Sequence, residues 1–206
     1  HCPANRSDEG SPSEDLNLGL KVRLSSGSVS LRQSDWTGFL QAWLQRNSEA
    51  RHNLCVVNPS TPAQYFHVLR RQIHRPYAKP VVIMSPKYLY HHGHCRSHMS
   101  AFDEGTFFHR LIAEGGDGDN MRGRTQASLG GLLPPPEIRR VIFCSVKVFY
   151  DLYHRRAALK MRDVMLVRVE QIAPFPYDRI KPVIQMHRHA EFVWVQEEPK
   201  NAGGYA

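Results

Sequence analysis

A strand–helix–strand pattern at residues 54–87 constrains the fold of this 206-residue chain more than any other feature. The apolar run LCVV at 54–57 precedes a turn at 58–62, and a segment with helical spacing follows. The segment KPVVIMSPK at 79–87 supplies a second apolar run, bounded by prolines. Two strands joined in this way by a helix are parallel, with a right-handed connection. The pattern predicts an α/β fold with a parallel sheet.

The helix in this unit is expected to have two different sides. Ser60 is a candidate N-cap, and Pro62 is tolerated in a first helical turn. Phe66, Leu69 and Ile73, at spacings of three and four, are predicted to form the apolar face, flanked by Tyr65 and Val68. The other side is predicted to carry His67, Arg70, Arg71 and His74. By this pattern alone, His67 is a solvated histidine on the polar side of a helix.

A second alternation of strands and helices begins near residue 141. VIFCS at 141–145, VMLVRV at 164–169 and EFVWVQ at 191–196 are predicted strands. Residues 147–160 are predicted to form a helix that buries Phe149, Leu152 and Leu159, and residues 176–187 a second helix that begins at a proline. This order predicts a doubly wound parallel sheet that is cut off at Ala206.

Four segments are expected along the chain. Residues 1–50 are expected to be divergent or disordered, although Trp36, Phe39, Leu40, Trp43 and Leu44 have helical spacing. Residues 51–90 contain the first α/β unit, and residues 137–206 contain the second. Residues 91–136 are expected to be a linker, because GGDGDNMRGRTQASLGGLLPPP at 115–136 buries too little apolar area to offset its chain entropy.

Composition restricts the class of protein. No apolar run approaches the roughly 18–20 residues of a membrane span. The four cysteines lie far apart without a CxxC pair, which argues against a disulfide framework and favours a reducing compartment. The net charge of +8 suggests nucleic acid as a partner, but the 27 Lys and Arg residues are scattered. A basic surface, or an interface in a larger assembly, is the favoured interpretation.

A histidine-rich segment is the one candidate metal site. His91, His92, His94, Cys95 and His98 are ligand types suited to zinc. A structural zinc site usually combines two spaced pairs, and no second pair supports this one. We therefore expect no metal there.

Six blocks in order carry a resemblance to a known family. They are NPSTPAQYFHVLRRQ (58–72), KPVVIMSPKYL (79–89), GTFF (105–108), IRRVIFCSVKVFYDL (138–152), VRVEQIAPFPYD (167–178) and WVQEEPKNAGG (194–204). With these blocks the chain resembles the C-terminal third of the thiamine-diphosphate-dependent, decarboxylating first component of 2-oxoglutarate dehydrogenase. The wording TPAQYFH also resembles the 2-oxoadipate dehydrogenase branch of that family.

The resemblance implies a fold and a reaction. Residues 51–90 would be the end of a transketolase-like pyrimidine-binding domain, and residues 137–206 the start of a truncated transketolase-type C-terminal domain. The parent enzyme decarboxylates 2-oxoglutarate oxidatively in the tricarboxylic acid cycle and transfers the succinyl group to lipoyl groups of dihydrolipoyl succinyltransferase. It works as a homodimer in the mitochondrial matrix, or in the bacterial cytoplasm.

The same resemblance implies that cofactor binding lies elsewhere. Thiamine diphosphate and Mg²⁺ belong to the full-length parent, and neither is expected to bind this fragment alone, which would be inactive. Gly116, Asp117 and Gly118 resemble the opening of the metal-binding motif, but the downstream asparagine pair is absent. We expect the chain to bind neither nucleic acid nor membrane. The rival interpretations are a non-catalytic dimerisation or complex-binding module and a basic nucleic-acid-binding protein.

The sequence makes predictions for three sets of residues that a structure can test. The resemblance implies that His67 contributes an active-site imidazole that helps to bind the 2-oxo acid, a task suited to a pKa near about 6.5. Arg70 and Arg71 form either a charged outer face or a subunit or domain contact. Val146 replaces a glycine of the family's CSGK block, and a positive φ there would strain a valine.

Overall fold

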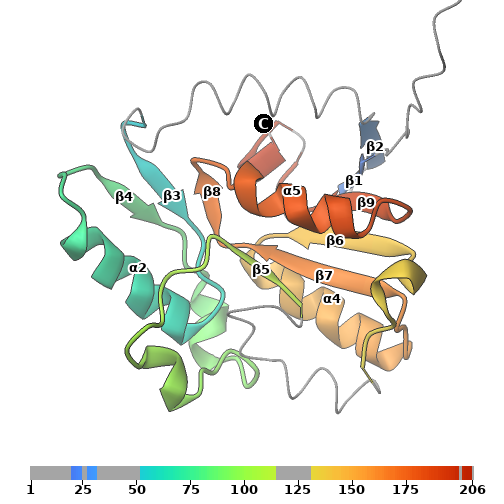
Figure 1. Cartoon of the computed structure of the whole chain (residues 1–206), viewed down its shortest axis with the longest axis horizontal. Helices are drawn as coiled ribbons and strands as arrows, with labels where there is room; N and C mark the ends of the chain where they lie inside the picture. Colours follow the sequence, from blue (N-terminus) through green and yellow to red (C-terminus); the bar gives the residue numbers. More distant parts are fainter. Residues whose placement is uncertain (1–19, 25–26, 32–51, 115–130, 200, 206) are drawn as a thin grey trace, which may run out of the picture.

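The computed structural model describes residues 20–24, 27–31, 52–114, 131–199 and 201–205, which build two sheets (Figure 1). The larger sheet has six strands in the order β2 (Gly27–Leu31), β1 (Leu20–Leu24), β9 (Glu191–Val195), β6 (Arg140–Cys144), β7 (Val164–Val169) and β5 (Leu111–Ala113). The smaller sheet has three, in the order β4 (Val81–Ile83), β3 (Cys55–Val57) and β8 (Gln171–Ala173).

The small sheet confirms the first predicted unit. β3 and β4 are parallel and are joined by the helix α2 (Pro62–His74). The third strand, β8, pairs with β3 in the antiparallel direction. Because β8 follows β7 after the single residue Glu170, the chain passes directly from the large sheet into the small one.

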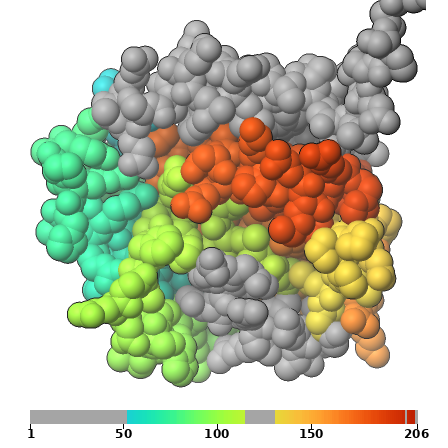
Figure 2. All heavy atoms as spheres, in the orientation of Figure 1, coloured from blue at the N-terminus to red at the C-terminus, as the bar shows by residue number. Residues whose placement is uncertain are grey.

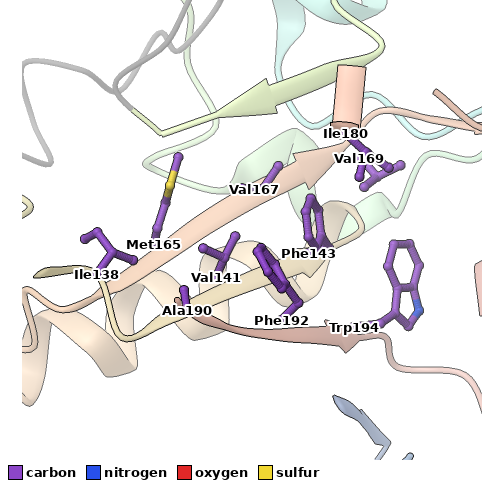
Figure 3. Packing of buried hydrophobic residues seen from close by; sticks show 10 residues of the cluster. All are labelled: Ile138, Val141, Phe143, Met165, Val167, Val169, Ile180, Ala190, Phe192 and Trp194. Carbon is purple, nitrogen blue, oxygen red and sulfur yellow. The ribbon is translucent and has the colours of Figure 1, made fainter. Parts of the chain in front are cut away.

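The large sheet confirms the doubly wound pattern. β6 is parallel to both β7 and β9, and the helices α4 (Val146–Ala158) and α5 (Tyr177–Met186) lie on opposite faces of these strands (Figure 1). Figure 3 shows one face, where the side chains of Phe143, Val167 and Phe192 rise together toward α5. On the other face, Cys144, which follows Phe143, and Leu166, which precedes Val167, pack against α4. The fold is therefore α/β, as the sequence predicts.

Two details of helix packing differ from the prediction. Thr61, not Ser60, is the N-cap of α2, because its hydroxyl accepts the N–H of Gln64 at 3.3 Å. Leu159 lies just beyond the end of α4 and is 52% exposed, whereas Phe149 is buried as expected.

The two sides of α2 differ from the expectation in part. Phe66, Leu69 and Ile73 are 42%, 42% and 81% exposed, whereas Gln64 and His67 are 2% and 3% exposed. Val68 is buried and His74 is exposed, as predicted. The helix turns Gln64 and His67 toward the segment 98–109, which offers backbone hydrogen-bond partners. Polar side chains can be buried there because the partners satisfy them.

Part of the interval expected to be a linker, residues 91–136, is regular structure. β5 pairs with β7, and Glu114 forms a buried salt bridge with Arg156 of α4. In Figure 2 the green and lime atoms of this segment fill the space between the turquoise α2 unit and the orange C-terminal unit. The prediction of a linker failed here because Glu114 pairs with Arg156 and because β5 forms backbone hydrogen bonds with β7. The glycine-rich residues 115–130 lie outside the described residues, and the domain boundaries stay a prediction.

Residues 1–50 differ from the expectation in a similar way. β1 and β2 pair with each other in the antiparallel direction, and β1 extends the large sheet by pairing with β9. The alternation of Leu20, Val22 and Leu24 is the strand signal that the sequence analysis missed. The expected helix at 36–44 lies outside the described residues. No helix in the described ranges has the length and apolar character needed to cross a membrane.

Val146 confirms the expected backbone strain. Its φ is +23°, and its side chain is 2% exposed at the first position of α4. A β-branched residue rarely adopts positive φ, because its Cβ crowds the backbone. The Val146 side chain packs on the face of the sheet that α4 covers, and this packing offsets the strain.

Comparing two substitutions at this position tests the strain. We expect Val146→Gly to be more stable than Val146→Ala by about 1 kcal/mol in urea unfolding, because alanine keeps the strained Cβ and glycine does not. Both variants should be less stable than the unsubstituted chain, because both lose buried methyl groups. At Lys147, the next residue of α4, the usual order should hold, with alanine more stable than glycine. An alanine variant at 146 that equals or exceeds the glycine variant would contradict the strain.

Candidate functional site

The loop between β3 and α2 is fixed by a buried acid from the other sheet. The Glu170 carboxylate accepts hydrogen bonds from the Ser60 backbone N–H at 2.7 Å and from the Ser60 hydroxyl. The main-chain oxygen of Glu170 accepts the N–H of Asn58, also at 2.7 Å. Ser60 and Glu170 are 0% and 1% exposed, so these contacts are shielded from water.

An arginine balances this buried carboxylate. Arg168 is 2% exposed, donates to the Ser60 hydroxyl at 3.1 Å, and lies over the ring of Phe149. Burial raises the pKa of the Glu170 carboxyl, and the charge of Arg168 and the bonds from Ser60 oppose that rise. We refer to Ser60, Arg168 and Glu170 as the Ser60 junction. It connects the start of α2 to the large sheet.

Two more side chains close around the Ser60 carbonyl. The Tyr150 hydroxyl donates to this oxygen at 2.6 Å, and the Cys95 thiol lies 3.3 Å from it. Burial raises the pKa of the Tyr150 hydroxyl and of the Cys95 thiol, so both groups stay protonated donors at neutral pH. The loop that precedes α2 is thus held from several elements at once.

α2 places His67 at a hollow one turn beyond this anchored loop. The hollow has a volume of about 230 Å³. It is lined by Ala63, Gln64, His67, Ser100, Ala101, Thr106, Phe107 and His109. His67 is the histidine that the resemblance singles out, and the structure buries it in the wall of this hollow. The segment 98–109, together with α2, forms the walls.

The ring of His67 has a defined orientation. Its Nε2 lies 2.7 Å from the carbonyl oxygen of Ala101, and a carbonyl can only accept, so Nε2 carries the proton. Nδ1 is buried and has no hydrogen-bond partner among the described residues. Burial lowers the pKa of His67, the Ala101 bond raises it in part, and the charge of Arg70 lowers it further. At neutral pH the ring is therefore neutral, with Nδ1 as an acceptor.

Arg70 and Arg71 make contacts within the chain. Arg70 donates to the carbonyl oxygen of Thr106, which lines the hollow. Arg71 donates to the Gln171 side chain of β8 at 2.9 Å and lies over the Phe108 ring at 4.3 Å. These contacts join segments of the chain, and the choice between a charged outer face and a subunit or domain contact stays open.

The histidine-rich segment packs as a ring cluster. His92 and His94 lie against His154 of α4, with ring centroids 5.6 and 4.8 Å away, and His92 also contacts Tyr150 at 4.6 Å. Within the ranges that the structure describes, no group of three or more His, Cys, Asp or Glu side chains is placed to hold a metal ion. Asp117 lies outside those ranges.

Comparisons with known proteins decide the family. Residues 96–206, more than half of the chain, match the model for the 2-oxoglutarate dehydrogenase C-terminal region. Residues 40–93 match the transketolase pyrimidine-binding domain. The chain belongs to the 2-oxoglutarate dehydrogenase E1 family. The E1 family resemblance of the sequence is thereby confirmed.

Individual relatives support this membership. The 2-oxoglutarate dehydrogenase E1 component of Brucella anthropi is 41% identical over 167 residues, which are 81% of this chain and 16% of the relative. A probable 2-oxoadipate dehydrogenase E1 homolog of Dictyostelium discoideum is 44% identical over 152 residues, which are 73% of this chain and 15% of the relative. The chain therefore spans about a sixth of the length of these E1 relatives.

The family match implies thiamine diphosphate as the cofactor of the parent E1 component. Glu170 lies beside the loop that precedes α2, and its carboxylate is occupied by Ser60. No group of three or more possible metal ligands is present in the described part of the chain.

Sequence reasoning missed two residues of this site. Gln64 reads as an ordinary polar residue, and His109 follows the GTFF block without any spacing signal. The two residues lie 45 positions apart in the sequence, although they are hydrogen-bonded. Glu170 does stand at a position that the sequence singles out, because ligand and contact residues gather at the carboxyl ends of parallel strands. Its partner Ser60, 110 residues away, could not be read from the sequence.

The burial of His67 has a measurable consequence for its titration. The pKa of His67 is lowered, so its NMR midpoint should fall below about 6.5. A base with a depressed folded pKa stabilises the fold above its unfolded pKa and loses that contribution as the pH falls. Arg70→Gln should raise the midpoint and Arg70→Lys should not, because lysine keeps the positive charge. A midpoint at or above 6.5 in the unsubstituted chain would contradict the burial of the ring.

Proposed function

We propose that this chain is part of the decarboxylating E1 component of a 2-oxoglutarate dehydrogenase complex, in which His67 contacts the 2-oxo acid. The observation that carries this proposal is the His67 ring, 3% exposed, in the wall of the hollow with one nitrogen hydrogen-bonded and the other without a partner among the described residues. A buried polar atom without a partner is costly unless a ligand or water satisfies it. Because the chain belongs to the E1 family, we propose that this ligand is a 2-oxo acid.

The chemistry of His67 follows from its proton. The neutral ring can accept a hydrogen bond at Nδ1, or take up a proton there. A substrate carboxylate close to the ring would favour the charged form, because an opposite charge raises the pKa of a histidine. His67 would then donate to the carboxylate through Nδ1 while Nε2 stays bonded to Ala101. Substrate binding and proton uptake would be linked at one ring.

The cofactor belongs to the same proposal. Thiamine diphosphate supplies the carbanion chemistry when bound, and the protein supplies orientation and electrostatics. Mg²⁺ and the diphosphate would be held by residues of the E1 component other than those described. This chain's own contribution is to fix α2 through the Ser60 junction and to hold the His67 ring.

The proposed partners fit exposed apolar side chains on α2. Phe66, Leu69 and Ile73 lie on its outer side and are 42%, 42% and 81% exposed. Apolar surface of this kind marks protein contacts. We propose homodimer contacts here and a lipoyl-bearing dihydrolipoyl succinyltransferase as the further partner. Location in the mitochondrial matrix, or in the cytoplasm of a bacterium, rests on the family alone, as does the choice of 2-oxoglutarate over 2-oxoadipate.

A chimera tests the function. In the Brucella anthropi E1 component, the matching 167 residues would be replaced by those of this chain. The chimera should decarboxylate 2-oxoglutarate, and His67→Ala should lower kcat/KM by about ten- to hundredfold, as expected for the loss of a hydrogen bond to a charged group. A folded, cofactor-loaded chimera without activity would contradict the proposal.

His74→Ala is the matched control for this experiment. His74 lies on the same helix, is exposed, and does not line the hollow. Its substitution should leave kcat/KM unchanged. An equal loss in both variants would mean that α2 tolerates no alanine at these positions, and would remove the case for His67 as a substrate contact.

A further inference from the structure

The hollow at His67 has a second histidine in its wall. His109 lines it from the segment that leads into β5, whereas His67 lines it from α2. None of the eight lining residues is acidic, and two of them, Ser100 and Thr106, carry hydroxyls. A hollow lined by two histidines and no carboxylate suits an anionic ligand, since it does not repel negative charge and a protonated imidazole donates to an anion.

Gln64 fixes the position of His109. The backbone N–H of His109 donates to Gln64 Oε1 at 3.0 Å, and Gln64 Nε2 donates to the His109 carbonyl at 3.3 Å. Both ends of one amide thus hold the main chain of a single residue. Gln64 is 2% exposed, so water does not compete for these bonds. Gln64 and His67 are three residues apart on α2 and share its buried face.

The ring of His109 is also oriented. It stacks on the ring of Phe107, with centroids 4.4 Å apart and planes 27° from parallel. Phe107 is itself part of the lining. The main chain and the ring of His109 therefore both have defined positions. A residue that contacts a ligand in one geometry needs such support.

We propose that His109 is a specificity-determining residue that contacts the carboxylate at the far end of the 2-oxo acid, and that Gln64 is its positioning residue. This role rests on the proposed function of the chain. His67 supplies one imidazole to the hollow, and a dicarboxylic substrate presents two anionic ends. His109 gives the second end a partner of its own, so the side chain favours a dicarboxylic over a monocarboxylic 2-oxo acid.

The same E1 chimera provides the measurement, with two substrates. 2-Oxopentanoate has the carbon chain of 2-oxoglutarate with a methyl group in place of the far carboxylate. His109→Ala should lower kcat/KM for 2-oxoglutarate by about ten- to hundredfold and change that for 2-oxopentanoate by less than about twofold. The ratio of the two values does not depend on the fraction of folded enzyme, so it reports contact rather than stability. An unchanged ratio would overturn the proposal.

Gln64→Leu separates positioning from contact. It should lower the same ratio, because it releases the main chain of His109, and the double variant Gln64→Leu/His109→Ala should be no worse than His109→Ala alone. Such non-additivity is expected when one residue acts through the other. Additive losses in the ratio would overturn the role of Gln64.

The two proposals can fail separately. A folded chimera without activity toward 2-oxoglutarate removes the proposed function, and the role of His109 with it. An active chimera that depends on His67, but keeps its substrate ratio in His109→Ala, overturns the role of His109 alone. His189→Ala is the control, because this exposed histidine lies between α5 and β9 and does not line the hollow.

Discussion

The buried carboxylate of Glu170 is the interaction on which the arrangement of this chain depends. It follows the last residue of β7, yet its side chain binds the loop that starts α2, so one residue links the large sheet to the small one. Arg168, two residues earlier on the same strand, shares the contact and balances the charge. A buried pair of this kind adds little net stability but is costly to break on one side. Its consequence here is geometric, because it sets where α2 begins.

The position of His67 follows from that constraint. Once the loop at Ser60 is fixed, the helix carries Gln64 and His67 to the segment 98–109, where both side chains are buried. Phe66, Leu69 and Ile73 are left outward, on a surface available to a partner. Burial also lowers the pKa of His67, so the ring is neutral at neutral pH. Position and protonation of the imidazole thus have the same origin.

The sequence predicted the parts of this fold that depend on local pattern. The βαβ unit, the doubly wound order and the strain at Val146 follow from apolar runs, proline positions and one replaced glycine, and the structure confirms them. The orientation of α2 and the strand β5 were missed, because their cause is a partner far along the chain. For α2 the hydrophobic pattern favoured the burial of Phe66, Leu69 and Ile73, which are exposed, although it placed Val68 correctly. His67 came from the family resemblance, whereas Gln64 and His109 needed the structure.

Native-state hydrogen exchange on the Glu170→Gln variant tests the central role of the Ser60 junction most directly. In the unsubstituted chain, amides of β3 and α2 should open with the same free energy as those of β6 and β7, as one cooperative unit. In Glu170→Gln, β3, α2, β6 and β7 should all open more easily by about 3–5 kcal/mol, because they open together. Arg139→Gln, which removes a mostly exposed ion pair with Asp163, is the control and should change none of them. Unchanged exchange in β3 and α2 of the Glu170 variant would contradict the account.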